Sequence, residues 1–266
     1  MLVAVITSQQ NKGLQDTFPP NKNSLKLYHR YSYIIDLTAM SPMKVAVVGA
    51  SGKVGRLLIN QLKANDSFST PLAIVRTQDQ VNYFKNEVGV DASLTDIENA
   101  SVSEITDAIK AYDAVVFSAG AGGKGMERIF TVDLDGCIKV VEACEKAGIK
   151  RFVVVSALKA EDRDFWYNIK GLREYYIAKR SADREVRNSN LDYTILQPGS
   201  LELNKGTGLL QPLDKLEEKA SVNYSINRED VASFIVESLL HPNATVKKTI
   251  SLVNGNEPME KFIQSL

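Results

Sequence analysis

The stretch Val45-Ala46-Val47-Val48-Gly49-Ala50-Ser51-Gly52-Lys53-Val54-Gly55 decides the fold of this chain. The four apolar residues at its start predict a strand that is buried on both faces. Three glycines follow with G-x-x-G-x-x-G spacing, and apolar residues then recur at helical spacing at Val54, Leu57, Leu58 and Leu62. The glycines therefore lie between a strand and the start of a helix, the context in which such a motif binds a pyrophosphate.

Each glycine of the motif has its own expected role. Gly49 permits the tight turn, Gly52 lets the backbone approach a pyrophosphate, and Gly55 lets the helix pack close to the strand. The free N–H groups at the helix N-terminus also suit phosphates. A plain turn without a ligand is the alternative, but it needs fewer glycines. The cofactor contacts expected in this stretch are Gly49, Ser51, Gly52, Lys53, Val54 and Gly55.

The composition indicates one α/β domain of ordinary size. The chain has 266 residues, of which 44% are hydrophobic and 24% charged, so it can bury a core. Lys+Arg and Asp+Glu number 32 each, and this balance argues against nucleic acid or an anionic membrane as the main partner. No apolar run approaches the ~18 residues of a membrane span. We expect a small-molecule substrate and a monomer or homodimer.

The chain has only two cysteines and two histidines, which argues against a disulfide and a metal site. Cys137 and Cys144 lie on one predicted helix, about 10 Å apart and too far for a disulfide. Buried thiols of this kind indicate a reducing compartment, so we expect a cytoplasmic protein. His29 and His241 have no metal-ligand spacing, and we expect no metal site.

Residues 1–42 do not share the pattern of the rest of the chain. Gln9–Lys26 is polar and contains Pro19-Pro20, without periodicity. A mitochondrial presequence would be rich in arginine and poor in acidic residues, and this stretch is neither. We interpret residues 1–42 as a disordered extension, or as translation assigned upstream of the true start. Residues 43–266 then form one NAD(P)-binding domain.

Strand and helix patterns alternate through this domain. Further strands are expected at residues 71–75, 88–93, 113–118, 151–158, 192–196 and 249–253, and helices at 126–148, 165–188 and 228–240. This alternation predicts a doubly wound parallel sheet of the Rossmann type, with a small C-terminal region on the substrate side. The polar stretch Asn204–Glu218 is expected to lie over the pocket.

The end of the second strand indicates which cofactor is bound. An NAD-selective site places a carboxylate there to accept from the ribose 2′-OH, whereas this strand ends in Arg76-Thr77-Gln78. The guanidinium of Arg76 suits a 2′-phosphate, so we expect NADP rather than NAD. A solvated arginine is the alternative. The fourth strand runs into a glycine-rich loop, where a cofactor crossing the sheet would meet Ser118, Ala119 and Gly120.

The motif Gly-Ala-Ser-Gly-Lys-Val-Gly at residues 49–55 resembles the fingerprint of the short-chain dehydrogenase/reductase superfamily. The run at residues 175–183, with residues 191–201 after it, resembles the atypical, NmrA-like branch of small NAD(P)-binding proteins. The resemblance covers roughly residues 43–255. It implies adenine contacts for Asp96 and Ile97, although Asp96 could instead cap a turn. It also implies cofactor contacts for Pro198 and Gly199 after the sixth strand.

Tyr175 and Lys179 form a Y-x-x-x-K motif, which places both on one helix face. A nearby ammonium would lower the pKa of the tyrosine, so that it could exchange a proton with a carbonyl or hydroxyl while a nicotinamide moves hydride. The resemblance implies that Tyr175 is the acid/base and that Lys179 also holds the ribose. A purely structural pair is the alternative. The resemblance also implies a catalytic serine after the fifth strand, and Ser156 is the candidate for it. Compared with the family, Ser156 lies about one position early, and Ala157 occupies the expected place.

The sequence therefore predicts an NADP-dependent oxidoreductase acting on a small carbonyl, quinone or flavin. The alternative is a catalytically silent NADP-binding regulator that senses the redox state. A sugar-nucleotide epimerase or dehydratase is a third interpretation. The chain after Ser200 is short for a sugar-nucleotide lobe, which disfavours it.

Overall fold

A seven-stranded sheet forms the centre of the molecule. The computed structural model describes residues 41–123, 125–219 and 224–266, so the interpretation of residues 1–42 lies almost wholly outside it. The strands run parallel in the order β10-β6-β5-β4-β1-β2-β3. Their bounds are β1 Val45–Val48, β2 Leu72–Val75, β3 Asp91–Leu94, β4 Ala114–Phe117, β5 Arg151–Val155, β6 Asp192–Pro198 and β10 Lys248–Leu252. The predicted doubly wound parallel sheet is confirmed.

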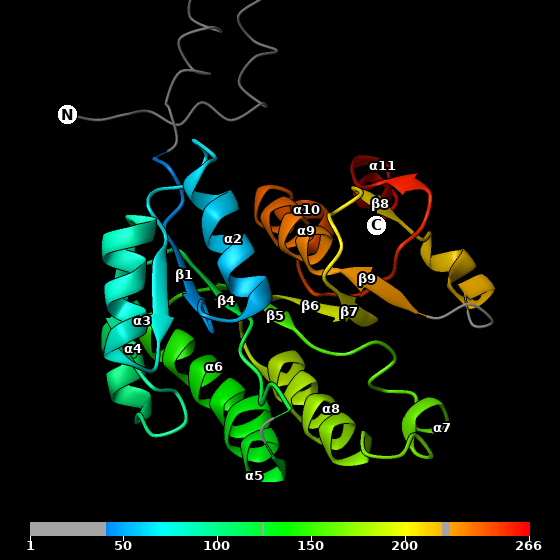
Figure 1. Cartoon of the computed structure of the whole chain (residues 1–266), viewed down its shortest axis with the longest axis horizontal. Coiled ribbons are helices and arrows are strands. Elements are labelled where there is room, and N and C mark those ends of the chain that lie inside the picture. The colour runs from blue at the N-terminus through cyan, green and yellow to red at the C-terminus, as the bar shows by residue number, and fades with distance from the viewer. Residues whose placement is uncertain (1–40, 124, 220–223) are drawn as a thin grey trace, which may run out of the picture. The chain divides into compact units, whose positions relative to one another are not determined.

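Helices cover both faces of the sheet (Figure 1). On one face lie α2 (Lys53–Lys63) and α9 (Arg228–Leu240), and on the other lie α4 (Val102–Ile109), α6 (Asp135–Ala147) and α8 (Arg173–Asn188). Alternate residues of β1 pack into the two cores, with Val45 and Val47 on the α2 side and Ala46 and Val48 on the α6 side. This burial on both faces explains the unbroken apolar run. The chain changes direction across the sheet between β1 and β4, which is where such folds bind ligands.

Two long helices that the sequence predicts are interrupted in the structure. The predicted helix 126–148 consists of α5 (Met126–Arg128), the π-helical η3 (Ile129–Leu134) and α6. The predicted helix 165–188 consists of α7 (Arg163–Trp166) and α8, separated by Gly171 at φ +79°. The strand expected at 88–93 begins only at Asp91, because α3 (Gln78–Asn82) continues into the π-helical η2 (Tyr83–Val88).

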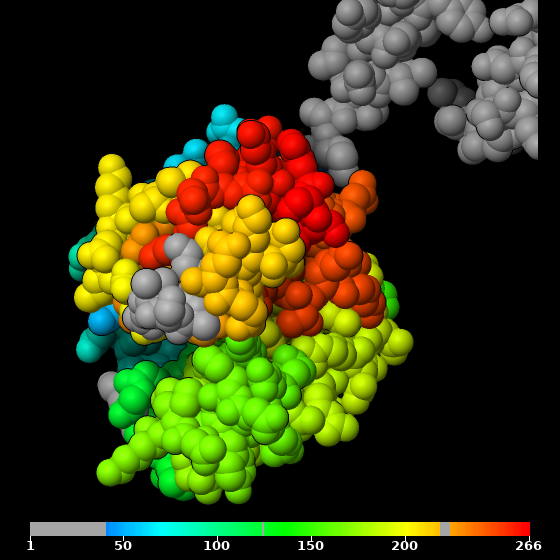
Figure 2. Space-filling view, turned by 90° about the vertical axis from the view of Figure 1, so that its right-hand side faces the viewer, coloured from blue at the N-terminus to red at the C-terminus, as the bar shows by residue number. Residues whose placement is uncertain are grey.

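The C-terminal region adds small elements at one end of the sheet, seen above α7 in Figure 2. They are β7 (Ser200–Glu202), β8 (Leu209–Leu210), the 3-10 helix η4 (Leu213–Lys219), β9 (Ser225–Asn227), α10 (Pro242–Thr245), β11 (Glu257–Pro258) and α11 (Met259–Gln264). β7 pairs with β9, and β8 pairs with β11. None of residues 204–218 lines the cavities described below, so the expectation that this stretch lies over the pocket is wrong.

Two further observations concern the helices. Within the residues that the structure describes, no helix is long and apolar enough to cross a membrane. Cys137 and Cys144 of α6 are both buried free thiols, as their spacing predicts.

Candidate functional site

Two cavities meet at the carboxyl edge of the sheet, beside the glycine-rich turn after β1. The first, here called the Arg76 cavity, has a volume of about 340 Å³. The second, here called the Tyr175 cavity, has a volume of about 640 Å³. Both are lined by Ser118–Gly122 in the loop after β4, so the two cavities adjoin along this loop.

The turn after β1 is too tight for side chains at two of its glycines. Gly49 has φ +80°, and a Cβ there would lie 2.6 Å from backbone atoms of Ala119. A Cβ on Gly55 would lie 2.4 Å from the carbonyl oxygen of Gly49. Gly52 is the N-cap of α2 and offers no capping side chain. The first backbone N–H groups of this helix are thus available to bind a ligand. The turn therefore fits the pyrophosphate of a dinucleotide.

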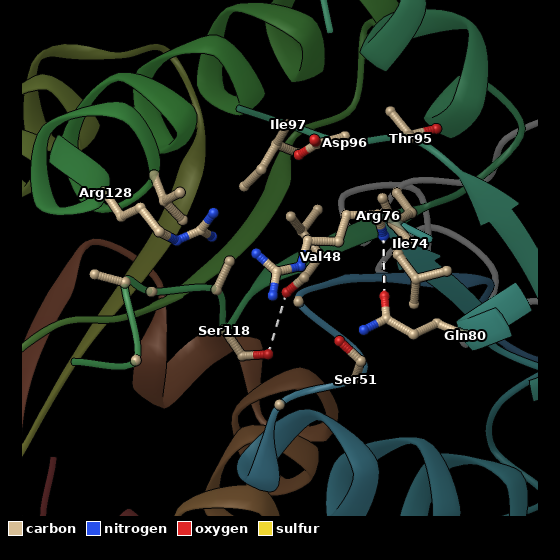
Figure 3. Close-up of a pocket in the computed structure, with 18 residues that line it drawn as sticks. Val48, Ser51, Ile74, Arg76, Gln80, Thr95, Asp96, Ile97, Ser118 and Arg128 are labelled. Atoms are coloured by element: carbon tan, nitrogen blue, oxygen red, sulfur yellow. Dashed lines mark hydrogen bonds between the residues drawn. The ribbon is translucent and has the colours of Figure 1, made fainter. Parts of the chain in front are cut away.

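Arg76 lies exposed directly after β2, and its backbone N–H donates to Gln80 Oε1 at 3.2 Å. Figure 3 shows the guanidinium groups of Arg76 and Arg128 projecting into the Arg76 cavity. Arg128 forms an ion pair with Glu98, which also accepts from Thr131 Oγ1 at 2.6 Å. The sequence did not indicate Arg128, because one arginine at the start of a predicted helix carries no distinguishing signal.

Asp96 and Ile97 line the same cavity (Figure 3). The carboxylate of Asp96 also accepts from Glu98 N–H at 3.2 Å and from Asn99 Nδ2 at 2.8 Å. Asp96 therefore caps the turn that follows it and faces the cavity at the same time. The two interpretations of this residue are compatible.

Lys179 lies in the wall of the Tyr175 cavity and is held by two acceptors. Its ammonium donates to the Val155 carbonyl oxygen at 3.0 Å and lies 3.0 Å from Asp133 Oδ1. The other oxygen of Asp133 accepts from the Ala121 N–H at 2.8 Å. Asp133 belongs to η3 and is buried, and the sequence analysis did not identify it. One carboxylate therefore joins α8 to the loop after β4.

The electrostatics of Tyr175 differ from the expectation. Burial raises the pKa of its phenol, and the Lys179 ammonium, 5.8 Å from the ring centroid, lowers it only in part. Burial alone would lower the pKa of Lys179, but the Asp133 carboxylate outweighs burial and raises it. The expected lowering of the tyrosine pKa is wrong, because burial outweighs the effect of the ammonium, which the Asp133 and Asp183 carboxylates also oppose. Tyr175 is therefore a protonated phenol at neutral pH.

Ser156 follows β5 and lines the Tyr175 cavity, but its hydroxyl donates away from it to Asp183 Oδ2 at 2.7 Å. Gln197 Nε2 donates to the same oxygen at 3.2 Å. Asp183 Oδ1 is buried and has no hydrogen-bond partner among the described residues. Burial raises the pKa of Asp183 to about 6. The Ser156 hydroxyl is thus committed to a carboxylate that titrates near neutral pH.

The structure brings most of the predicted site residues together. The Arg76 cavity is lined by Gly49, Ser51, Gly52, Arg76, Asp96, Ile97, Ser118, Ala119 and Gly120. The Tyr175 cavity is lined by Val54, Ser156, Tyr175 and Lys179, and again by Ser118, Ala119 and Gly120. Four predicted contacts line neither cavity, namely Lys53, Gly55, Pro198 and Gly199. Gly199 serves packing, since a Cβ there would lie 2.2 Å from the Tyr224 carbonyl oxygen.

Known proteins share this architecture and much of the sequence. A family model described as NAD(P)H-binding matches residues 49–242. A Bacillus subtilis protein described as an uncharacterized sugar epimerase, YhfK, is 38% identical over 84% of this chain and 100% of its own length. A Bacillus halodurans structure described as an NAD-dependent epimerase/dehydratase has 37% identity and a TM-score of 0.75, covering 84% of this chain and 100% of its own. The structure of the oxidoreductase ylbE from Lactococcus lactis has 33% identity and a TM-score of 0.74, and the match covers 84% of this chain and 96% of its own.

Proposed function

The chain belongs to the NAD(P)H-binding family, and from this premise we propose that it is an NADP-dependent oxidoreductase acting on a small carbonyl, quinone or flavin. The observation that carries the proposal is the junction of the two cavities. A cavity with the features of a dinucleotide site adjoins one lined by a tyrosine and a lysine, through the shared loop Ser118–Gly122.

Arg76 supports NADP over NAD. Its guanidinium projects into the cavity at the place where NAD-selective sites carry an acidic residue. A planar cation with several donors matches the geometry of a 2′-phosphate. The amides at the start of α2 would hold the pyrophosphate, and Asp96 and Ile97 would contact the adenine.

The residues around Tyr175 support a reductive role. A bound reduced nicotinamide supplies hydride. Tyr175, whose raised pKa keeps it protonated, donates its proton to the substrate oxygen that gains negative charge. The Lys179 ammonium, fixed by Asp133 and the Val155 carbonyl, lies beside the phenol and stabilises part of the negative charge on the tyrosinate that remains.

One observation favours the second candidate, a catalytically silent NADP-binding regulator. The Ser156 hydroxyl donates to Asp183, so it is not free to orient a substrate carbonyl while Asp183 is ionised. A site without this donor would still bind the dinucleotide. We prefer the oxidoreductase because Tyr175 remains as a donor on the cavity wall.

Turnover separates the two candidates. NADPH and NADH affinities would be measured by titration calorimetry, and NADPH oxidation would be followed with a panel of aldehydes, ketones, quinones and riboflavin. The oxidoreductase requires NADPH oxidation with at least one panel compound. Tight NADPH binding without turnover across the panel would support the regulator, and absence of NADP(H) binding would refute both.

A further inference from the structure

The Tyr175 cavity has an apolar wall. Thirteen of its nineteen lining residues are glycine or apolar, and the bulky ones are Val54, Met126, Ile129, Val155, Leu172 and Leu201. Its volume of about 640 Å³ is in the range that holds a drug-sized molecule. Met126 is 57% exposed and Leu172 is 40% exposed, so a ligand that covered them would remove apolar surface from water.

The polar groups of this cavity are mostly engaged with the protein. Ser118 Oγ donates to the Val48 carbonyl oxygen at 3.1 Å, and Ser156 donates to Asp183. Lys179 and Asp133 neutralise each other. Among the polar side chains that line the cavity, only those of Tyr175 and Glu174 form no hydrogen bond or ion pair with other described residues. A ligand therefore meets one neutral donor and one carboxylate.

This charge pattern is unsuited to a sugar nucleotide. Among the described lining residues Lys179 is the one cation, and its charge is compensated by Asp133. The diphosphate of a sugar nucleotide would lose hydration without gaining a free cation from the described lining residues, and it would be repelled by Glu174. The hydroxyls of a hexose would find few partners on an apolar wall.

We propose that the Tyr175 cavity takes an uncharged, apolar ring compound with a carbonyl group and without phosphate or carboxylate. This inference rests on the proposed function and narrows its substrate class. The carbonyl oxygen lies at Tyr175, and the rings lie against the apolar wall formed by Met126, Ile129, Leu172 and Leu201. Glu174 excludes anionic analogues.

The reaction of such a substrate balances with NADPH as reductant. The carbonyl carbon gains a hydride, with its two electrons, from the reduced nicotinamide, which becomes NADP⁺. The C=O π bond breaks, and its oxygen takes the proton of the Tyr175 phenol. The tyrosinate regains a proton from water, so one carbonyl, one NADPH and one proton yield one alcohol and one NADP⁺.

Binding of a matched ligand pair tests the inference without turnover. The neutral ketone 2-acetylnaphthalene, its anionic analogue 6-acetyl-2-naphthoate and UDP-glucose would be titrated calorimetrically into the protein saturated with NADP⁺. We expect the neutral ketone to bind about tenfold or more tightly than the carboxylate, since an uncompensated like charge nearby costs about that factor. Tighter binding of UDP-glucose or of the carboxylate than of the ketone would overturn the inference.

Two variants with controls locate the binding. Glu174→Gln should reduce the ratio of affinities between the ketone and the carboxylate to below about threefold. Leu172→Ser should lower the affinity for the ketone several-fold. Leu203→Ser, at a residue that is 73% exposed and outside the cavity, should leave this affinity unchanged. An unchanged ratio in Glu174→Gln, or equal effects of the two leucine substitutions, would contradict the assigned cavity.

The same titrations distinguish this inference from the proposed function. If the ketone binds with the expected selectivity but no compound of the panel oxidises NADPH, the ligand class stands and the oxidoreductase does not. If NADPH is oxidised with a phosphorylated or carboxylated substrate while the ketone fails to bind, the oxidoreductase stands and the ligand class is wrong.

Discussion

The Lys179 ammonium lies 3.0 Å from Asp133 Oδ1, and the two side chains are only 5% and 1% exposed. Asp133 simultaneously accepts from the Ala121 N–H, so this pair links the helix that carries Tyr175 to the loop shared by both cavities. Tyr175 remains a proton donor chiefly because burial raises its pKa, and the Asp133 carboxylate of this pair opposes the lowering by the Lys179 ammonium. Removal of either side chain of the pair would leave the other charge buried and unpaired, which lowers the free energy of unfolding.

Breaking this buried pair should destabilise the protein strongly. Lys179→Met leaves the Asp133 carboxylate buried without its cation, and we expect a loss of about 3–5 kcal/mol in the free energy of unfolding. The double variant Lys179→Met/Asp133→Asn should recover much of this loss, because the amide oxygen of Asn still accepts from Ala121. Denaturant unfolding of the single and double variants measures both effects.

An exposed ion pair provides the matched control. Lys110 and Asp107 lie 2.9 Å apart with side chains 63% and 69% exposed, so Lys110→Met should cost less than about 1 kcal/mol. If Lys179→Met costs no more than Lys110→Met, the buried pair does not have the structural role assigned to it.

The stability of the protein should depend on pH through Asp183. Burial raises the pKa of its carboxyl to about 6 from its ordinary value of 3.8, so between these pH values the folded state binds a proton that the unfolded state has released. The contribution is fully present below about pH 4 and is lost as the pH rises through 6. The loss is about 3 kcal/mol, because one pKa unit corresponds to 1.36 kcal/mol.

Asp183→Asn should flatten this dependence. The amide oxygen can still accept from Ser156 and Gln197, and the side chain no longer ionises. The variant should approach the parent in stability at pH 4 and exceed it at pH 8, whereas Asp164→Asn, at an exposed position, should follow the parent at both. If the free energy of unfolding of Asp183→Asn still fell between pH 4 and 7 as steeply as that of the parent, the titration would belong to another group.

The sequence predicted the elements whose apolar residues follow a regular pattern, such as β1 and α2, because these patterns are local features of the sequence. It also located Tyr175 and Lys179 on one helix beside the cavity. It did not predict Asp133, because nothing in its spacing separates this buried residue from the exposed Asp135 two positions later. The π-helical turn that carries Asp133 depends on tertiary contacts, as does the pKa of Tyr175, and neither has a local signature.

Arg76 should determine the choice between the two nicotinamide cofactors. A charge-assisted contact to a 2′-phosphate favours NADPH over NADH by roughly ten- to a hundredfold. Arg76→Glu should abolish or reverse this preference while NADH affinity falls little, which makes NADH the internal control. Titration calorimetry gives both affinities, and equal affinities of the unmutated protein for NADPH and NADH would refute the assignment.

Tyr175→Phe separates an enzyme from a regulator. The substitution removes only the hydroxyl and leaves the ring to pack, so NADPH affinity should change less than about twofold. Turnover of a carbonyl substrate should fall by about 10²–10⁴-fold, the usual contribution of a general acid. Because burial raises the pKa of the phenol above its ordinary value, the unmutated protein should keep its carbonyl reduction rate through neutral and mildly alkaline pH and lose it only in the strongly alkaline range.

The neighbouring Tyr176 gives the control for this experiment. It is buried, stacks on Trp166 with ring centroids 5.6 Å apart, and does not line the cavity. Tyr176→Phe should therefore retain turnover within a few-fold of the parent. A regulator would show no turnover before mutation, and a flavin reductase would keep its rate in Tyr175→Phe, since hydride transfer to a stacked flavin needs no phenolic acid. A full rate of carbonyl reduction in Tyr175→Phe would mean that the proton comes from another group.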